Sequence, residues 1–131
     1  HIVNVELELE HDVTYDGIKS LLVSQQYDHL SNLPSAPDSP MVVLDESPTR
    51  AKHLWGSSHN SNPNPSEELV AGMETCVHLE NVSGNTITFK ALSHNTIRGA
   101  AGGVVLLAEL ALAEGKIPSV DINPSNVSSK R

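Results

Sequence analysis

The chain has few cysteines, few aromatic residues and no long apolar run, and each shortage excludes a class of protein. Its single cysteine, Cys76, cannot form an intrachain disulfide, which suits a reducing, cytoplasmic compartment. Aromatic residues make up 3% and hydrophobic residues 38% of the 131 residues, which suffices for one compact domain with a modest core. The most apolar stretch, residues 99–113, is too short to span a bilayer and contains Glu109. We therefore expect a cytoplasmic protein with no membrane partner.

Basic residues are scarce as well. Eight Lys and Arg residues face 16 Asp and Glu residues, which gives a formal net charge of −8. Nucleic acid and anionic membranes both require a positive patch, and the longest basic run here is Lys130-Arg131, so we expect neither as a partner. The first residue is His1 rather than Met, which leads us to expect a processed product or a fragment of a longer protein.

Alternation of apolar and polar residues predicts three half-buried strands. Residues 3–9 alternate Val and Leu with Asn and Glu, and the same period of two runs through residues 73–79 and 86–91. Residues 81–85, which include a Ser-Gly pair, predict the turn of a β-hairpin between the last two of these strands. Residues 41–44 form a short continuous apolar run and predict a buried strand.

Two helices complete the predicted fold. Thr14 or Asp16 can cap the first helix, and Asn95 or Thr96 can open the last, which ends near Gly115. This element order predicts an α+β fold, in which a mostly antiparallel sheet carries both helices packed on one face. The other face of the sheet is polar, and we expect it to meet water or a partner subunit. It carries Asn4, Glu6, Glu8, Glu74, Cys76, His78, Thr86, Thr88 and Lys90.

The segments between these elements are rich in Pro, Ser and Asn. Three prolines within residues 34–40 predict an extended connector. Residues 45–68 are polar and predict a mobile loop, whose largest apolar residue, Trp55, is expected to dock on the domain. We expect one domain over residues 1–117 and a flexible tail over residues 118–131.

The last motif of the chain is its most specific feature. Residues 89–103 read FKALSHNTIRGAAGG and lead into an Ala- and Leu-rich helix that closes with Gly115-Lys116-Ile117. This segment is similar to the last motif of aspartate-semialdehyde dehydrogenases. Residues 1–7, 33–37 and 72–77 resemble the family's histidine strand, a connector before its central strand, and the strand before the last motif. The likeness runs in register from the first residue to about Ile117.

The resemblance implies the C-terminal catalytic and dimerisation domain of an enzyme that makes aspartate semialdehyde from aspartyl phosphate with NADPH, in amino-acid biosynthesis. His1 matches the family histidine that moves the proton of the hydride-transfer step, a task suited to a side chain that titrates near neutral pH. Asn95 matches the asparagine that lies against the nicotinamide of NADP, and Gly99 lets a flat ligand approach the helix start. The family pairs subunits through this domain, so a homodimer or a missing N-terminal domain is the expected partner.

Each of these residues also has a plain structural interpretation. Small residues at 99–103 can serve only to let the helix pack on the sheet. His1 can be a tag remnant or a frayed end, and Val3 stands where the family usually has Glu or Gln. Cys76 has His78 two residues away, but we expect a structural thiol, because free cysteine usually behaves as a small hydrophobe.

Other parts of the complete family enzyme are absent from this sequence. It has no Gly-x-Gly-x-x-Gly turn of a nucleotide-binding domain, and the family's nucleophilic cysteine and substrate arginine lie upstream of His1. We therefore expect the isolated chain to bind no cofactor and to be inactive as a dehydrogenase. His53 and His59 lack the converging partners of a metal site, so no metal is expected.

A second interpretation is a free-standing, repurposed descendant of the family. It is favoured by the family's Arg- and Pro-rich stretch after the central strand, which has largely lost its arginines in residues 45–55. Such a protein would be a non-redox enzyme that uses acid/base chemistry on a carbonyl substrate, or a binding or assembly module. Its ligand would be a small carbonyl or carboxylate compound.

Overall fold

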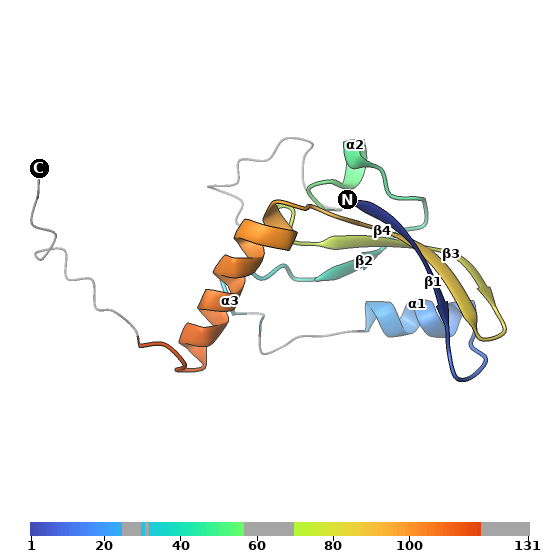
Figure 1. The fold of residues 1–131 in the computed structure, drawn as a ribbon, viewed down its shortest axis with the longest axis horizontal. Helices are drawn as coiled ribbons and strands as arrows, with labels where there is room; N and C mark the ends of the chain where they lie inside the picture. Colours follow the sequence, from blue (N-terminus) through green and yellow to red (C-terminus); the bar gives the residue numbers. More distant parts are fainter. Residues whose placement is uncertain (25–29, 31, 57–69, 119–131) are drawn as a thin grey trace, which may run out of the picture.

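The computed structural model describes residues 1–24, 30, 32–56 and 70–118. Its strands form one four-stranded sheet in the order β1-β4-β3-β2 (Figure 1). The strands are β1 (Ile2–Glu8), β2 (Met41–Val43), β3 (Thr75–Ser83) and β4 (Thr86–Ser93). The helices are α1 (Tyr15–Val23), α2 (Arg50–His53), the π-helical turn η1 (Ile97–Ala101) and α3 (Gly102–Ala113).

The sheet confirms the predicted α+β class with mostly antiparallel pairing. β1 and β3 both pair antiparallel with β4, whereas β2 lies parallel to β3. β4 is therefore the strand that joins the beginning of the chain to the rest of the sheet. β2 is half-buried instead of buried, because it is a short strand at the edge of the sheet.

The β3–β4 hairpin has a tighter turn than the predicted one. Only Gly84 and Asn85 separate the two strands, and Gly84 takes a φ of 58°, which favours glycine. A β-bulge shifts the register between Leu79 and Asn81. Because a bulge inserts one residue into a strand, Val82 returns to the core face instead of pointing away from it.

α1 lies below the sheet and packs on the centre of the core. Thr14 Oγ1 accepts a hydrogen bond from the Gly17 N–H at 3.1 Å, so Thr14 is the cap among the two predicted candidates. Ile18 packs with Leu79 and Ile87. This contact fixes α1 under the hairpin.

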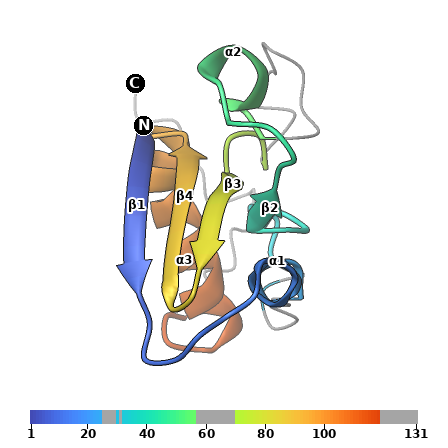
Figure 2. The ribbon, with the colours of Figure 1, turned by 90° about the vertical axis from the view of Figure 1, so that its right-hand side faces the viewer.

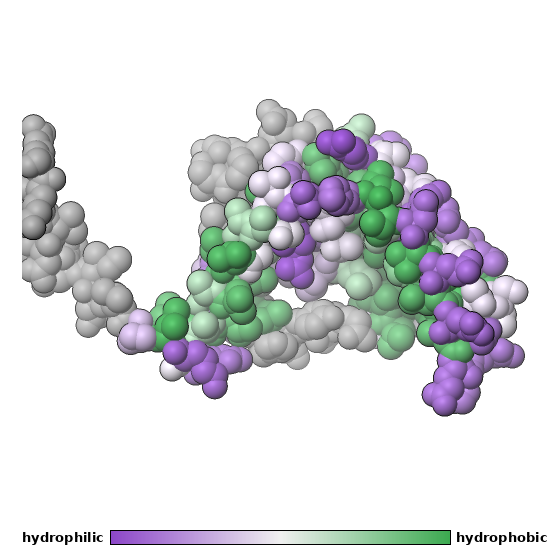
Figure 3. Space-filling model, viewed as in Figure 1, coloured by the Kyte–Doolittle hydropathy of each residue, from purple (hydrophilic) through white to green (hydrophobic). Residues whose placement is uncertain are grey.

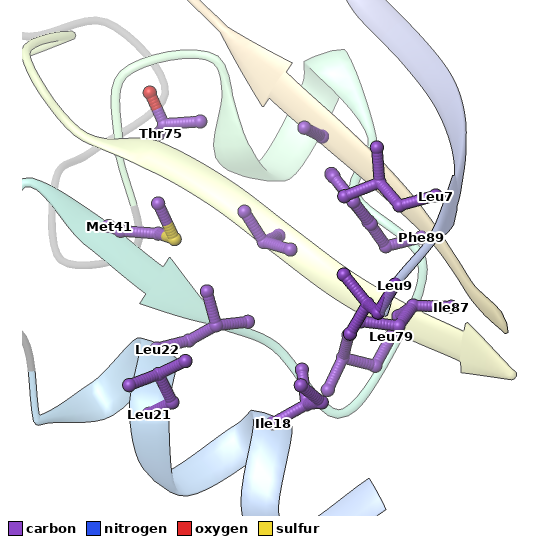
Figure 4. A pocket seen from close by; sticks show the side chains of 12 residues that line it. Leu7, Leu9, Ile18, Leu21, Leu22, Met41, Thr75, Leu79, Ile87 and Phe89 are labelled. Atoms are coloured by element: carbon purple, nitrogen blue, oxygen red, sulfur yellow. The ribbon is translucent and has the colours of Figure 1, made fainter. Parts of the chain in front are cut away.

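The apolar face of the sheet is only partly covered. A hollow of about 350 Å³ lies between α1 and the strands (Figure 4). It is lined by Leu7, Leu9, Ile18, Leu21, Leu22, Met41, Thr75, Val77, Leu79, Ile87, Phe89 and Ala91. α1 therefore leaves much of this face open. The surface view shows one group of hydrophobic residues on the sheet side and a separate group on α3, with hydrophilic residues between them (Figure 3).

α3 lies beyond the ends of the strands, on the same side of the sheet as α1 (Figure 1). None of its residues is buried, and Val104 and Leu107 expose 67% and 64% of their surface. Glu109 is the polar exception on this helix. Its carboxylate accepts hydrogen bonds from the N–H of buried Ser35 at 3.0 Å and from its hydroxyl at 2.9 Å, and so ties α3 to the connector. No helix among the described residues is long and apolar enough to cross a membrane.

α2 was missed by the sequence pattern, because it is a four-residue helix inside the predicted loop. The Thr49 Oγ1 caps it by accepting the Lys52 N–H at 3.3 Å. α2 lies on the side of the sheet opposite α1 (Figures 1 and 2), where the Cys76 thiol lies 3.9 Å from the His53 carbonyl. The expectation that Cys76 faces water or a partner is therefore wrong: it is buried. Residues 57–68 of the predicted loop, and the tail from 119, lie outside the described residues.

Replacing Ser35 by Ala removes one donor to the charged carboxylate of Glu109. We expect the free energy of unfolding to fall by about 1–3 kcal/mol and amide exchange in α3 to become faster. Hydrogen exchange over residues 102–113 measures this loosening. Ser20→Ala, at an exposed position of α1, is the matched control and should change neither quantity. Equal protection of α3 in both variants would show that this contact does not hold the helix.

Candidate functional site

The pairing of β1 with β4 brings the first residue of the chain to the last motif. The amine of His1 donates to the Ser93 carbonyl at 2.7 Å, and the Ser93 N–H donates to the His1 carbonyl at 3.1 Å. These residues are 92 positions apart in the sequence. Ser93 directly precedes His94 and Asn95, so the predicted acid/base residue and the predicted cofactor-binding motif meet at one end of the sheet.

His94 is held on two sides of its ring. It stacks on Trp55 with ring centroids 4.5 Å apart and planes tilted by 44°. Its Nδ1 accepts the Ile97 N–H at 3.2 Å, so the neutral ring carries its proton on Nε2. Burial, and to a smaller extent the positive charge of Arg50, lowers the pKa of His94 below its ordinary value. A neutral, fixed ring therefore stands directly before Asn95.

Asn95 and Gly99 lie together on an open surface. The Gly99 N–H donates to the His94 carbonyl at 3.2 Å as part of η1, and π-helical turns are frequent at functional sites. A Cβ added to Gly99 would lie 3.6 Å from the Asn95 Oδ1, which is ordinary contact. Both residues are exposed. A flat ring could therefore approach the backbone at Gly99 with the amide of Asn95 beside it.

The next glycines serve packing instead. A Cβ at Gly102 would lie 2.5 Å from the Met73 sulfur, and a Cβ at Gly103 would lie 2.6 Å from the Arg98 carbonyl oxygen. Met73 is fully buried, so it has little room to give way. The two interpretations of the small-residue motif thus apply at different positions. Gly99 is open to a ligand, whereas Gly102 and Gly103 allow close contact within the fold.

Sequence reasoning missed Arg50, His94 and the target of Trp55. Two local signals could have pointed to these residues. Thr49 is a good helix cap in a polar stretch and precedes Arg50, and Gly72 precedes a strand. Gly72 takes a φ of 79° and donates its N–H to the Trp55 carbonyl at 2.8 Å. This contact anchors the Trp55 segment beside the motif, so that its ring reaches His94.

Cys76 is unsuited to nucleophilic chemistry in this fold. The side chain is fully buried, and burial, with a smaller effect of Glu74, raises the pKa of its thiol to about 11. His78 does not pair with it, since the His78 Nδ1 lies 3.1 Å from the Leu44 carbonyl oxygen. The structural interpretation of Cys76 therefore fits its surroundings.

The described residues contain no cluster of acidic, histidine or cysteine side chains that could hold a metal ion. The His53 Nδ1 accepts the Thr49 N–H at 3.1 Å, which is a helix-cap contact. His59 lies outside the described residues. The described part of the chain thus offers open amide and imidazole groups around Asn95 and His1, and no cluster of the kind that holds a metal ion.

The raised pKa of Cys76 predicts slow alkylation of the native chain. Each pKa unit changes the thiolate fraction tenfold, so near pH 8 we expect the native thiol to react about 100 times more slowly than the unfolded one. Reaction with iodoacetamide, followed by mass spectrometry with and without urea, measures the ratio. Equal rates in both conditions would contradict a buried thiol.

The comparisons with known proteins agree on one family. No protein-family model matches the chain. Over 87 residues, 65% of the chain, it is 41% identical to the malonyl CoA reductase (NADP) of Metallosphaera sedula, of which it covers 22%. Over 119 residues, 84% of the chain, it is 28% identical to the aspartate-semialdehyde dehydrogenase of Methanothermobacter thermautotrophicus, of which it covers 30%.

The fold points to the same family. It is similar to the crystal structure of the aspartate-semialdehyde dehydrogenase with NADP from Candida albicans, with a TM-score of 0.55 and 25% identity. The match covers 80% of this chain and 27% of that one. The chain thus spans between about a fifth and a third of the length of these relatives. In sequence and in fold, it is an aspartate-semialdehyde dehydrogenase-like C-terminal portion.

Proposed function

We propose that this chain provides the acid/base and nicotinamide-contacting part of an NADP-dependent dehydrogenase that converts aspartyl phosphate to aspartate semialdehyde. The observation that carries the proposal is the mutual hydrogen bonding of the His1 and Ser93 backbones, which sets a histidine residue beside the motif that contains Asn95. The likeness to two NADP-linked relatives supports the same reaction class.

The residues of the chain would divide the work as follows. His1 is exposed at the strand start and would take up or release the proton of the reaction, because imidazole titrates near neutral pH. Asn95 would hold the nicotinamide of NADP by its amide, over the open backbone at Gly99. NADP, when bound, supplies the hydride chemistry. His94 would act as a positioning residue, since Trp55 and the Ile97 N–H fix its ring next to Asn95.

A nucleophile and a nucleotide-binding region would have to come from elsewhere in the protein. Cys76 is buried with a raised thiol pKa, so it does not supply the nucleophile. In this proposal the missing N-terminal part of a longer chain brings both groups to the site. In this proposal the isolated chain is inactive. It acts in the cytoplasm, in amino-acid biosynthesis, as one domain of the longer protein.

A second candidate reaction is the reduction of malonyl-CoA. It is favoured by one observation, the 41% identity to the malonyl CoA reductase over 87 residues, which exceeds the 28% identity to the aspartate-semialdehyde dehydrogenase. Both reactions need a proton-transferring imidazole and a nicotinamide contact. The choice between the two substrates is therefore made by residues other than His1 and Asn95.

A chimera tests the proposal. Residues 1–117 replace the matching segment of the Methanothermobacter enzyme, and we expect phosphate-dependent reduction of NADP with aspartate semialdehyde. His1→Asn should lower kcat about 10²–10⁴-fold, as expected for loss of a general acid/base. His11→Asn, at an exposed loop position, is the matched control and should leave kcat unchanged.

The same chimera is assayed with malonyl-CoA and NADPH, and the isolated chain serves as the inactive reference. A folded chimera that binds NADP but loses no activity with His1→Asn would refute the acid/base role. Activity of the isolated chain that disappears in Cys76→Ser would refute the need for a missing segment.

Two glycine substitutions separate ligand binding from packing. Gly99→Ala adds a methyl group at an open position, so we expect an unchanged free energy of unfolding but a raised KM for NADPH in the chimera. Gly102→Ala would push against Met73 and should cost about 1–3 kcal/mol of stability. Urea unfolding of the isolated chain and NADPH titration of the chimera measure the two effects. A Gly99→Ala variant with unaltered KM would mean that no cofactor approaches there.

A further inference from the structure

His94 supplies two of the acceptors at which the hydrogen bonding of η1 starts. Its carbonyl accepts the Gly99 N–H at 3.2 Å, and its ring Nδ1 accepts the Ile97 N–H at 3.2 Å. Thr96, which directly precedes η1, makes no side-chain cap bond to it. The first N–H groups of a helix have no partner within the helix and need one from outside. The imidazole of His94 is therefore the side chain that caps this turn.

The ring of His94 has little room to turn away from this bond. Its face lies against Trp55, with ring centroids 4.5 Å apart. A Cβ added to Gly72 would lie 3.3 Å from the His94 Cβ and 3.4 Å from the ring Cδ2, so the backbone of Gly72 runs close beside the ring. Gly72 is buried, and its N–H bonds to the Trp55 carbonyl at 2.8 Å. These contacts hold the Nδ1 atom at the Ile97 N–H.

Protonation of the ring is incompatible with the bond to Ile97. Neutral imidazole has one N–H group and one acceptor nitrogen, whereas the imidazolium ion has two N–H groups and no acceptor. Because Nδ1 is the acceptor of the neutral ring, the added proton would sit on Nδ1 and face the Ile97 N–H. Two donors would then oppose each other at the start of η1. Either the ring must move or the turn must open.

The charged groups around His94 act in the same direction. Burial and, to a smaller extent, Arg50 lower the pKa of His94. Arg50 starts α2, which lies at the same end of the sheet as the start of β1 (Figure 2). The amine of His1 is a further positive charge where no residue precedes it, and Glu74, directly before β3, is not among the groups that shift His94. Trp55 would attract an imidazolium ion but offers Nδ1 no acceptor.

We propose that the uncharged imidazole of His94 keeps η1 formed and so positions Asn95 and Gly99, and that a proton on its Nδ1 opens this turn. Binding of NADP at that surface therefore weakens as the pH falls. His94 is then a positioning residue that makes the cofactor contact sensitive to pH. The ligand in this inference comes from the proposed function, whereas the capping of η1 does not depend on it.

The lowered pKa of His94 gives the direction of the effect. In the formed turn this pKa lies below its ordinary value, whereas in an opened turn it returns to about 6.5. The opened turn therefore binds the proton more tightly. The stabilisation of η1 by His94 is complete above about pH 6.5 and is lost as the pH falls below that value.

The two histidines near the motif predict separable effects of pH. His1 is exposed, and in the proposed reaction its titration changes kcat. His94 acts through the backbone of η1, so its titration changes the dissociation constant of NADP. A binding measurement without turnover therefore isolates the contribution of His94.

Two substitutions in the full chain separate the acceptor from its titration. His94→Asn keeps an acceptor oxygen near the place of Nδ1 at every pH, whereas His94→Leu offers no acceptor. In the unaltered chain we expect the protection factor of the Ile97 amide to fall about tenfold between pH 7.5 and 5.5, because the ring gains its proton over this range. The factor should stay constant in His94→Asn and be low at both pH values in His94→Leu. Hydrogen exchange followed by NMR measures it.

The fluorescence of Trp55, which is the single tryptophan of the chain, provides a second readout. We expect it to titrate together with the Ile97 exchange in the unaltered chain and in the control His11→Asn, an exposed loop position, but in neither His94 variant. Circular dichroism checks that all forms fold. Protection of Ile97 that is independent of pH in the unaltered chain, or equally dependent on pH in His94→Asn, would overturn the role of His94.

Binding of NADP to the chimera tests the consequence for the cofactor. Calorimetry at pH 7.5 and 5.5 gives Kd, and His94→Asn corrects for titration of the NADP phosphates. We expect Kd to rise about tenfold more in the unaltered chimera than in His94→Asn, and His94→Leu to bind weakly at both pH values. Equal changes of Kd in the unaltered and Asn forms would overturn the link to the cofactor. If no form binds NADP, the proposed function fails, while the exchange of Ile97 still decides whether His94 caps η1.

Discussion

The antiparallel pairing of β1 with β4 is the constraint on which the rest of the structure depends. It joins residues that are 92 positions apart, and it fixes which side chains of β1 reach the apolar face. Without this register, His1 would have no defined place relative to Ser93 and the motif after it. The same register decides where β1 keeps unpaired backbone groups, since alternate residues of an antiparallel strand bond to one side only.

A second constraint is that this portion of chain does not cover its own apolar surface. α3 is apolar apart from Glu109 and has no buried residue, and a helix of that composition is normally enclosed. The hollow below the sheet has an entirely apolar lining apart from Thr75. Exposed patches of this kind mark contact surfaces. They fit the proposed longer protein, since the chain spans at most about a third of its relatives.

Much of the fold could be predicted because its strands alternate cleanly and its helices have caps. The alternation of apolar and polar residues predicts β1, β3 and β4, and Thr14 predicts the start of α1. The bulge after Leu79 could not be predicted, because an inserted residue leaves no compositional trace. α2 was hidden for another reason: its four residues, Arg-Ala-Lys-His, are too few to show an apolar period.

The site residues that belong to a recognisable motif could be predicted, whereas those that only tertiary contacts bring together could not. Asn95 and Gly99 were identified by resemblance, but the support of His94 by Trp55 depends on a Gly72 backbone conformation that composition does not reveal. β1 is the element that carries this dependence on tertiary contacts. Its odd-numbered residues bond to β4 and so hold the backbone of His1 at the start of the motif, which a sequence pattern alone does not reveal.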